Sequence, residues 1–238
     1  MSKKAWIIFI VIVIGLLTGL VLWSRGSTPQ VDVSNVNPNS IIAASSANGN
    51  VGDHVFGNTD GKVLLIEYGD FQCPGCAGAF TNTSAIQKLY KDQVAFVFRH
   101  FPLTTIHPNA LASATVAEAA GQQGKFWEMH DLLFEQREGW VNLSADQRGQ
   151  VFLGYATQLG LDITQFKTDQ ASKVVSEKIS RDQALGGKVN VNSTPSLFVG
   201  STKVNDEIVN DVIQNKGEKL MDMIDAALKA AGETPPIR

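Results

Sequence analysis

The N-terminal part of the chain shows an unbroken apolar pattern. Residues 5–23 contain no charged side chain, and a helix of this length spans roughly 28 Å, close to the hydrocarbon thickness of a bilayer. Trp6 and Trp23 stand at the two ends of the stretch, where aromatic side chains favour the membrane interface. The pattern predicts one transmembrane helix within an N-terminal anchor over residues 1–24.

The residues around this stretch predict its orientation and its connection to the rest of the chain. Lys3 and Lys4 precede it and Arg25 follows it, which predicts a cytoplasmic N-terminus and an extracytoplasmic location for the rest of the chain. No small-residue cleavage site closes the stretch, so an uncleaved single-pass anchor is expected. Residues 25–50 are rich in Ser, Asn, Pro and Gly and have no lasting apolar period, which predicts a flexible linker.

Strand and helix patterns alternate at the start of the folded region, which we place at residues 51–232 with a short frayed tail at 233–238. Residues 63–68 form an apolar run broken only by Glu67, as is typical of a central strand covered on both faces. A helical pattern follows, and residues 94–103 form a second buried strand. Strand, helix and strand at this spacing predict a βαβ unit.

A helical block separates this unit from the C-terminal elements. Helical patterns fill about residues 104–188, and short strand patterns follow at 196–199 and 203–205. Residues 220–231 then show the clearest amphipathic helix of the sequence. This order predicts an α/β domain with an inserted all-helical subdomain.

Composition and charge narrow the range of partners. The chain has 238 residues, of which 44% are hydrophobic, enough for the core of one folded domain with attachments. The formal net charge of −3 and the pI near 5.8 leave no general cationic surface. We therefore expect no nucleic-acid partner.

The two cysteines of the chain, Cys73 and Cys76, lie three positions apart. Pro74 suits the first turn of a helix, so Cys73 is expected at a helix N-terminus, where free backbone N–H groups favour a thiolate. Cys76 would lie one turn inside and be shielded. The pattern indicates a reactive thiol and a resolving thiol that exchange disulfides without a further cofactor.

Two other interpretations of the cysteine pair are weaker. A structural disulfide here would close a loop of only four residues, and it would stabilise the fold by roughly 2 kcal/mol before strain, against about 3 kcal/mol for a fifteen-residue loop. A metal site needs four ligands, and the sequence has no second cysteine pair and no closely spaced histidines. We therefore expect no metal, and we interpret His107 and His130 as packing or capping residues.

Two features elsewhere in the sequence fit thiol exchange. Glu67 lies six residues before Cys73, and a carboxylate buried there would have a raised pKa and pass protons to and from Cys76. The alternative for this residue is a solvated glutamate at a strand edge. Thr194-Pro195 opens a later strand, and a proline there can form a cis peptide and leave the preceding backbone free to pair with a client chain.

These residues together resemble the DsbA-like branch of the thioredoxin superfamily. The matching segments occur in order along nearly the whole folded region, at residues 70–76, 98–103, 107–120, 125–135 and 193–200. The resemblance implies a thioredoxin fold with inserted helices, with Cys73 as nucleophile and Cys76 as resolving thiol. It also implies a cis peptide at Thr194-Pro195 and Glu67 as a buried acid near the pair. The implied partners are unfolded or reduced exported proteins and a quinone-linked membrane protein that reoxidises the enzyme.

One departure from the family pattern leaves the direction of electron flow open. Strongly oxidising members carry His between the cysteines, whereas the dipeptide here is Pro74-Gly75. Cys73 then lacks one donor for its thiolate, which predicts a less oxidising centre. The leading hypothesis is an extracytoplasmic enzyme that forms disulfides in exported proteins. The alternatives are the same chemistry run as a reductase or isomerase, and a membrane-tethered chaperone or binding module with an idle cysteine pair.

Overall fold

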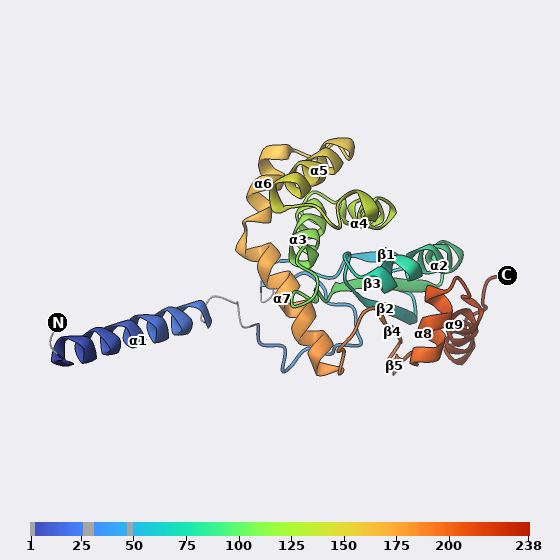
Figure 1. Cartoon of the computed structure of the whole chain (residues 1–238). Coiled ribbons are helices and arrows are strands. Elements are labelled where there is room, and N and C mark those ends of the chain that lie inside the picture. The colour runs from blue at the N-terminus through green and yellow to red at the C-terminus, as the bar shows by residue number, and fades with distance from the viewer. Residues whose placement is uncertain (1–2, 26–30, 47–49) are drawn as a thin grey trace. The chain divides into compact units, whose positions relative to one another are not determined.

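The chain divides into two units, Met1–Val31 and Asp32–Arg238 (Figure 1). The structure is a computed structural model, and the residues that it describes are 3–25, 31–46 and 50–238. The second unit contains the cysteine pair and all of the strands described below.

The first unit contains helix α1 (Lys3–Arg25), which covers the stretch predicted to span a membrane. Over the part of the chain that the structure describes, no helix combines the length and the apolar character that a membrane crossing requires. The side chain of Trp23 and the linker residues 26–30 and 47–49 lie outside the described residues. The anchor therefore stays a prediction from the sequence.

A five-stranded sheet of order β1-β3-β2-β4-β5 forms the centre of the second unit. Its strands are β1 (Val55–Gly57), β2 (Val63–Gly69), β3 (Val94–His100), β4 (Ser196–Val199) and β5 (Thr202–Lys203). β2 runs parallel to β3 and antiparallel to β4, and every residue of β2 and β3 is buried. The two apolar runs of the sequence are therefore central strands, as predicted. β1 pairs antiparallel with β3 and was not predicted, because three residues carry too little periodicity.

Helices pack on both faces of the sheet. Those on one face are α2 (Pro74–Tyr90), α8 (Asp206–Ile213) and α9 (Glu218–Ala230). Their apolar side chains join Val63 and Leu65 of β2 in one core. The alternate residues Leu64 and Ile66 belong to a second core, which contains Leu185 of α7 (Lys173–Lys188). The period of two along β2 thus directs successive side chains to the two cores.

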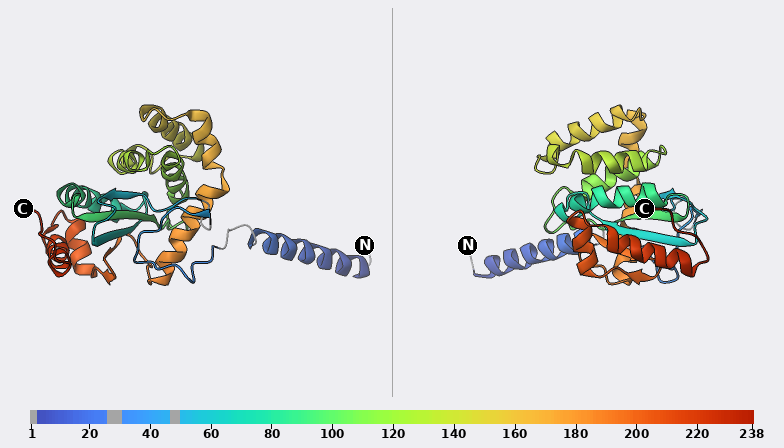
Figure 2. Two further views of the ribbon diagram at one scale, coloured as in Figure 1. Left: turned by 180° about the vertical axis from the view of Figure 1, so that it is seen from behind. Right: turned by 90° about the vertical axis from the view of Figure 1, so that its right-hand side faces the viewer.

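An all-helical insertion connects β3 to β4, in agreement with the predicted helical block at 104–188. It comprises α3 (Ala110–Gly121), α4 (Phe126–Glu135), the 3-10 helix η2 (Arg137–Gly139), α5 (Ala145–Gln158), α6 (Ile163–Gln170) and α7. Figure 2 shows α3 to α6 grouped on the opposite side of the sheet from α9. The core of the insertion contains Trp140 and Phe152 and extends to Cys73 and Cys76. The cysteine pair therefore lies where the insertion meets the sheet.

The segment after β4 differs from the prediction. The strand predicted at 203–205 ends at Lys203, and the side chain of Asn205 instead caps α8 by accepting a hydrogen bond from the Ile208 amide at 2.9 Å. α8 was not predicted. Its stability comes from this cap and from Val212, which is buried in the core that α8 shares with α2 and α9.

Residues 32–42 form an arm that is docked on the second unit, where the sequence predicts a flexible linker. Lys188 donates hydrogen bonds to three backbone carbonyl groups of the arm at 2.7–3.0 Å. The buried guanidinium of Arg99 donates to the carbonyl group of Ser40 at 2.8 Å and pairs with Asp53 at 2.8 Å. The composition of the arm does not predict this docking, because Lys188 and Arg99 bind its backbone carbonyl groups, which every residue type has.

The C-terminal tail at 233–238 is also held, where the sequence predicts a frayed end. Arg238 pairs with Asp222 at 2.7 Å and with Asp225 at 2.6 Å, both on α9. Asp225 in turn accepts a hydrogen bond from the Tyr90 hydroxyl at 2.6 Å. The tail is thereby tied to the core around α2 and α9.

Candidate active site

Cys73 lies at the N-terminus of α2, as predicted. It is the N-cap residue of this helix and has an extended backbone conformation. Pro74 occupies the first turn, where its missing N–H removes no helical hydrogen bond. Cys73 is 7% exposed and Cys76 is fully buried, and both are free thiols. The pair is therefore asymmetric: only the first sulfur is near the surface.

The surroundings of Cys73 favour its thiolate. Hydrogen bonding with the Cys76 side chain is the largest cause, and the backbone amides of Gly75 and Cys76 also contribute. The side chain of Thr194 contributes as well. Burial opposes these donors, yet together they lower the pKa of Cys73 from 9.0 to about 5. Cys73 is thus ionised at neutral pH.

Cys76 shows the opposite behaviour. Burial is the main cause that raises its pKa well above 9.0, and the neighbouring Cys73 and Glu67 raise it further. One contact works in the other direction, since the backbone amide of Asp70 lies 3.5 Å from the Cys76 sulfur. Cys76 therefore stays protonated when Cys73 is ionised.

Glu67 is a buried acid on the central strand β2, which excludes the alternative of a solvated strand edge. It pairs in register with Leu197 of β4 and with Phe98 of β3. Burial raises the pKa of Glu67 from 4.5 to about 8, and the charge of Cys73 adds to this shift. A carboxyl group with such a pKa holds its proton at neutral pH and is able to release it.

The Thr194-Pro195 peptide is cis, as the family resemblance implies. The loop before β4 brings it against the cysteine motif: a Cβ atom placed on Gly75 would lie 3.3 Å from Pro195 Cδ. Cys73 Sγ lies 3.3 Å from the Thr194 carbonyl oxygen. The structure thus brings together the residues proposed from the sequence, although 121 positions separate Cys73 from Thr194.

The carboxylate of Asp70, which was not predicted as a site residue, holds the loop before the cysteines. It accepts hydrogen bonds from the backbone amides of Gln72 at 2.8 Å and of Leu103 at 3.0 Å. It also lies 2.7 Å from Nδ1 of His107, which therefore has a positioning contact beside the motif. The sequence does contain one sign of this role, because Asp70 is a charged residue directly after a buried strand.

Gln72 is a second such residue, buried beside Cys73. Its side chain accepts a hydrogen bond from the Asn109 amide at 2.6 Å and donates one to the Val141 carbonyl at 3.2 Å. Its own carbonyl group is bound by Arg137. Asn109, Arg137 and Val141 belong to the insertion, so no local pattern around the cysteines indicates them.

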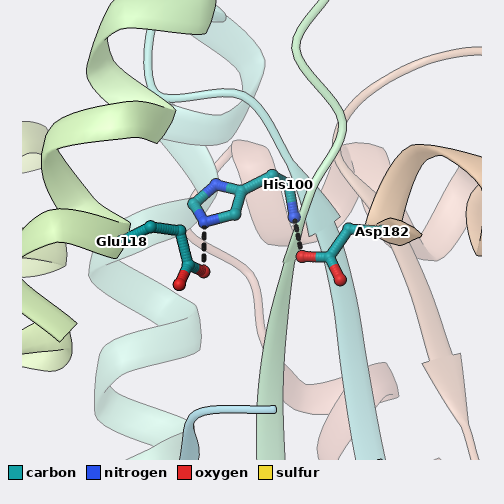
Figure 3. A group of neighbouring side chains, drawn as sticks. All are labelled: His100, Glu118 and Asp182. Carbon is teal, nitrogen blue, oxygen red and sulfur yellow. Dashed lines mark hydrogen bonds and ion pairs between the residues drawn. The ribbon is translucent and has the colours of Figure 1, made fainter. Parts of the chain in front are cut away.

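One buried cluster has a spacing of donor atoms that suits a metal ion. The potential ligand atoms of His100, Glu118 and Asp182 lie within 4.8 Å of one another (Figure 3). The buried Lys178 ammonium, however, lies 2.6 Å from Asp182 and 3.6 Å from Glu118. Burial opposes its charge, but these carboxylates outweigh that effect and raise the pKa of Lys178. The cluster is thus a salt-bridge network whose cation is a lysine.

His130 fills a structural position, as predicted. Its ring is buried, packs edge-on against Phe98 with 4.8 Å between centroids, and contacts Phe71 and Phe134. Burial lowers the pKa of His130, although the adjacent Asp131 works against this effect. The ring is therefore a neutral part of the aromatic core next to the cysteine motif.

Sequence comparison finds similarity both to a family and to larger proteins. A family model described as thioredoxin matches residues 49–216. The Na(+)/H(+) antiporter NhaA 1 of Salinispora arenicola is 39% identical over 153 residues, which are 63% of this chain and 22% of the antiporter. The NhaA 1 antiporter of Mycolicibacterium vanbaalenii is 37% identical over 154 residues, 63% of this chain and 24% of that protein. The chain thus spans about a quarter or less of these relatives.

Solved structures share the fold over most of their length. A thioredoxin-like oxidoreductase from Silicibacter pomeroyi is 26% identical, with a TM-score of 0.54 over 70% of this chain and 92% of that chain. BdbD from Bacillus subtilis is 20% identical, with a TM-score of 0.60 over 80% and 98%. DsbA from Xylella fastidiosa is 20% identical, with a TM-score of 0.54 over 73% and 92%. The chain belongs to the thioredoxin family, and its fold is that of the DsbA-like thiol–disulfide oxidoreductases.

Proposed function

We propose that this chain is a thiol–disulfide oxidoreductase that forms disulfide bonds in exported proteins through Cys73 and Cys76. The observation that carries the proposal is the asymmetry of the pair. The pKa of Cys73 is lowered to about 5, whereas burial raises the pKa of Cys76. A thiolate is both the nucleophile and the favoured leaving group in disulfide exchange, so the first sulfur is suited to react with clients.

The oxidising cycle begins with Cys73 and Cys76 joined in a disulfide. A client thiolate attacks the sulfur of Cys73, the bond between the two cysteines breaks, and Cys76 leaves with the electron pair. A second client thiolate then attacks the client sulfur of the mixed disulfide and releases Cys73 as a thiolate. The client has lost two electrons and gained a disulfide, and the enzyme has become the dithiol.

Glu67 supplies the proton for this cycle. When Cys76 leaves, its buried sulfur needs a proton, because its raised pKa disfavours the charged form. Glu67 holds one at neutral pH, since its own pKa is raised to about 8. We assign Glu67 as the acid that protonates Cys76 and as the base that removes the proton when the disulfide forms again.

The same asymmetry supports the oxidising direction. A lowered pKa of Cys73 stabilises the reduced enzyme and makes its disulfide more ready to accept electrons. The reverse direction, reduction or isomerisation of client disulfides, uses the same sulfur atoms. Equilibration of the protein with glutathione buffers distinguishes the two directions. A reduction potential of the Cys73–Cys76 pair near that of glutaredoxins or lower, below about −200 mV, would favour a reductase.

The cellular arrangement is proposed from the sequence. An anchor at residues 5–23 would hold the domain on the extracytoplasmic side of the membrane, where clients emerge unfolded. The reduced pair would then return its two electrons to a quinone-linked membrane protein. Protease accessibility in intact cells tests this topology: degradation of the domain from outside supports it, and protection contradicts it.

Two variants test the chemistry. The full chain with Cys73→Ser is expected to lose oxidation of a reduced, unfolded client, and full activity of this variant would refute the assignment. With a client that already contains a disulfide, Cys76→Ser is expected to accumulate a mixed disulfide, because the Cys73 thiolate attacks the client bond and the resolving thiol is missing. Retained binding of clients by a double Ser variant, with no exchange in the parent protein, would instead favour a chaperone.

A further inference from the structure

A groove lies beside the cysteine motif on the surface of the helical insertion. Its first part has a volume of about 660 Å³ and begins at Gln72, the residue before Cys73. Its second part, of about 600 Å³, lies among α3, α5 and α6. Pro108 and Arg148 line both parts, so the two parts adjoin at these residues. We call this surface the insertion groove.

The insertion groove is where exposed apolar side chains gather. Within the described residues of the second unit, the large hydrophobic side chains that are exposed are Ile106 (68%), Leu111 (50%) and Ile237 (97%). Ile237 belongs to the C-terminal tail, whereas Ile106 lines the first part of the groove and Leu111 lines the second. Exposed apolar side chains gathered in a concave surface are typical of a protein-binding site.

Two positive charges in the groove have no acidic partner. Arg148 donates a hydrogen bond to the side chain of Asn109, and no carboxylate among the described residues pairs with it. Lys167, which lines the second part, likewise has no carboxylate partner in the described part of the chain. Both cations are therefore available to an acidic ligand, although the chain as a whole has a net charge of −3.

The position of the groove decides what binds there. The groove adjoins Cys73, because the preceding residue Gln72 lines it. An extended client chain in mixed disulfide with Cys73 advances about 3.3–3.6 Å per residue. A few residues beyond the client cysteine would therefore lie in the groove. Apolar client side chains would contact Ile106 and Leu111, and acidic ones would pair with Arg148 and Lys167.

We propose that the insertion groove binds the client polypeptide beside its reacting cysteine and selects segments that combine apolar with acidic side chains. This inference rests on the proposed function, because it takes Cys73 as the residue that reacts with clients. It adds a second contact surface, on the insertion, to the one that Thr194 and Pro195 form on the sheet.

The test compares two dithiol peptides that differ only in whether glutamate or lysine residues flank the cysteine. The oxidised full chain is expected to oxidise the acidic peptide about three to five times faster in kcat/KM, as expected for partly exposed ion pairs. Arg148→Glu should reverse this preference, and Arg148→Gln should abolish most of it. Lys88→Glu, an exposed substitution at the far end of α2, is the matched control and should leave the preference unchanged.

A small uncharged substrate separates the groove from the chemistry. Mercaptoethanol is too small to reach Arg148, so its rate of oxidation should be the same in all four proteins. Equal rates for both peptides in the parent protein would overturn the proposal. So would an Arg148→Glu variant in which the ratio of the two peptide rates, each taken relative to the mercaptoethanol rate, stays at the parent value.

Failure of the proposed function would look different. If the protein oxidised neither the peptides nor mercaptoethanol, exchange itself would be absent. Binding of the same peptides with serine in place of cysteine, measured by fluorescence anisotropy, then tests the groove alone. Tighter binding of the acidic peptide that Arg148→Glu removes would support the groove, and equal binding of both peptides would refute it.

Discussion

The guanidinium of Arg137 donates two hydrogen bonds to the carbonyl oxygen of Gln72, from Nη2 at 2.6 Å and from Nε at 3.2 Å. Arg137 belongs to the helical insertion, and Gln72 immediately precedes Cys73. The insertion therefore fixes the peptide group that leads into the reacting cysteine. This contact gives the insertion a hold on the cysteine motif that is separate from the insertion groove.

Loss of this contact is expected to slow disulfide exchange. Arg137→Gln removes the paired donors and leaves the Gln72 carbonyl with at most one, so exchange should slow about tenfold, in line with the loss of roughly 1.4 kcal/mol. Arg137→Lys keeps the positive charge but lacks the two adjacent N–H donors of the guanidinium, so it should recover only part of the exchange rate. The measurement is exchange with a reduced peptide together with the pKa of Cys73. Parent-like rates in both variants would show that exchange does not need the contact between Arg137 and Gln72.

Glu67→Gln is expected to change how stability depends on pH. Burial raises the pKa of Glu67 from 4.5 to about 8, so the folded protein keeps a proton that the unfolded chain releases between these values. The free energy of unfolding should therefore fall as pH rises through this window. The amide does not titrate, so the variant should lack this fall and be the more stable protein above about pH 8.

The same variant should slow the chemistry. Without the carboxyl group Cys76 has no buried proton donor, and a reduction in exchange rate of about one to two orders of magnitude is expected. Urea unfolding of the reduced proteins at several pH values and peptide oxidation at neutral pH are the two measurements. Identical pH profiles of stability for parent and variant would contradict the buried-acid assignment.

Much of the fold could be predicted from the sequence because its strongest signals are local. The runs that became β2 and β3 are apolar throughout, which only strands covered on both faces can tolerate. Cys73 followed by Pro74 marked a helix start. Features that depend on distant partners were invisible: the arm at 32–42 docks on Lys188 and Arg99, and no local pattern reveals those contacts.

In the candidate site too, local patterns were predictable and contacts between distant residues were not. The two cysteines and Pro195 carry recognisable motifs, and Glu67 is conspicuous because it is charged within an apolar run. Arg137 lies in a short polar segment of ordinary composition. Only the three-dimensional contact with Gln72 distinguishes it from other surface arginines.

Gly75→His is expected to make the centre more oxidising. A Cβ atom at this position lies 3.3 Å from Pro195 Cδ and 3.6 Å from Cys73 Sγ, so the side chain fits after a small shift. The imidazole adds a donor near the thiolate, which should lower the pKa of Cys73 further and raise the reduction potential. Each tenfold change in the equilibrium with glutathione corresponds to about 30 mV. Gly75→Ala is the control, and an equal potential in both variants would contradict the role of the donor.

Lys178→Met is expected to destabilise the fold strongly. The lysine is the buried cation between Asp182 and Glu118, and its removal leaves their negative charges uncompensated. Loss of one partner from such a network lowers the free energy of unfolding by about 3–5 kcal/mol. Lys173→Met is the matched control, because this lysine lies on the same helix with an 80% exposed side chain. Its effect should stay below about 0.5 kcal/mol, and similar effects of the two substitutions would refute the network's role.

Titration of the reduced protein tests the central claim most directly. Alkylation by iodoacetamide, followed by mass spectrometry from about pH 3 to about pH 10, reports which sulfur is ionised and at what pH. Half-maximal reactivity at Cys73 near pH 5, with Cys76 unmodified, is the predicted result. Reactivity that rises only near pH 9, or modification of Cys76 before Cys73, would contradict the account.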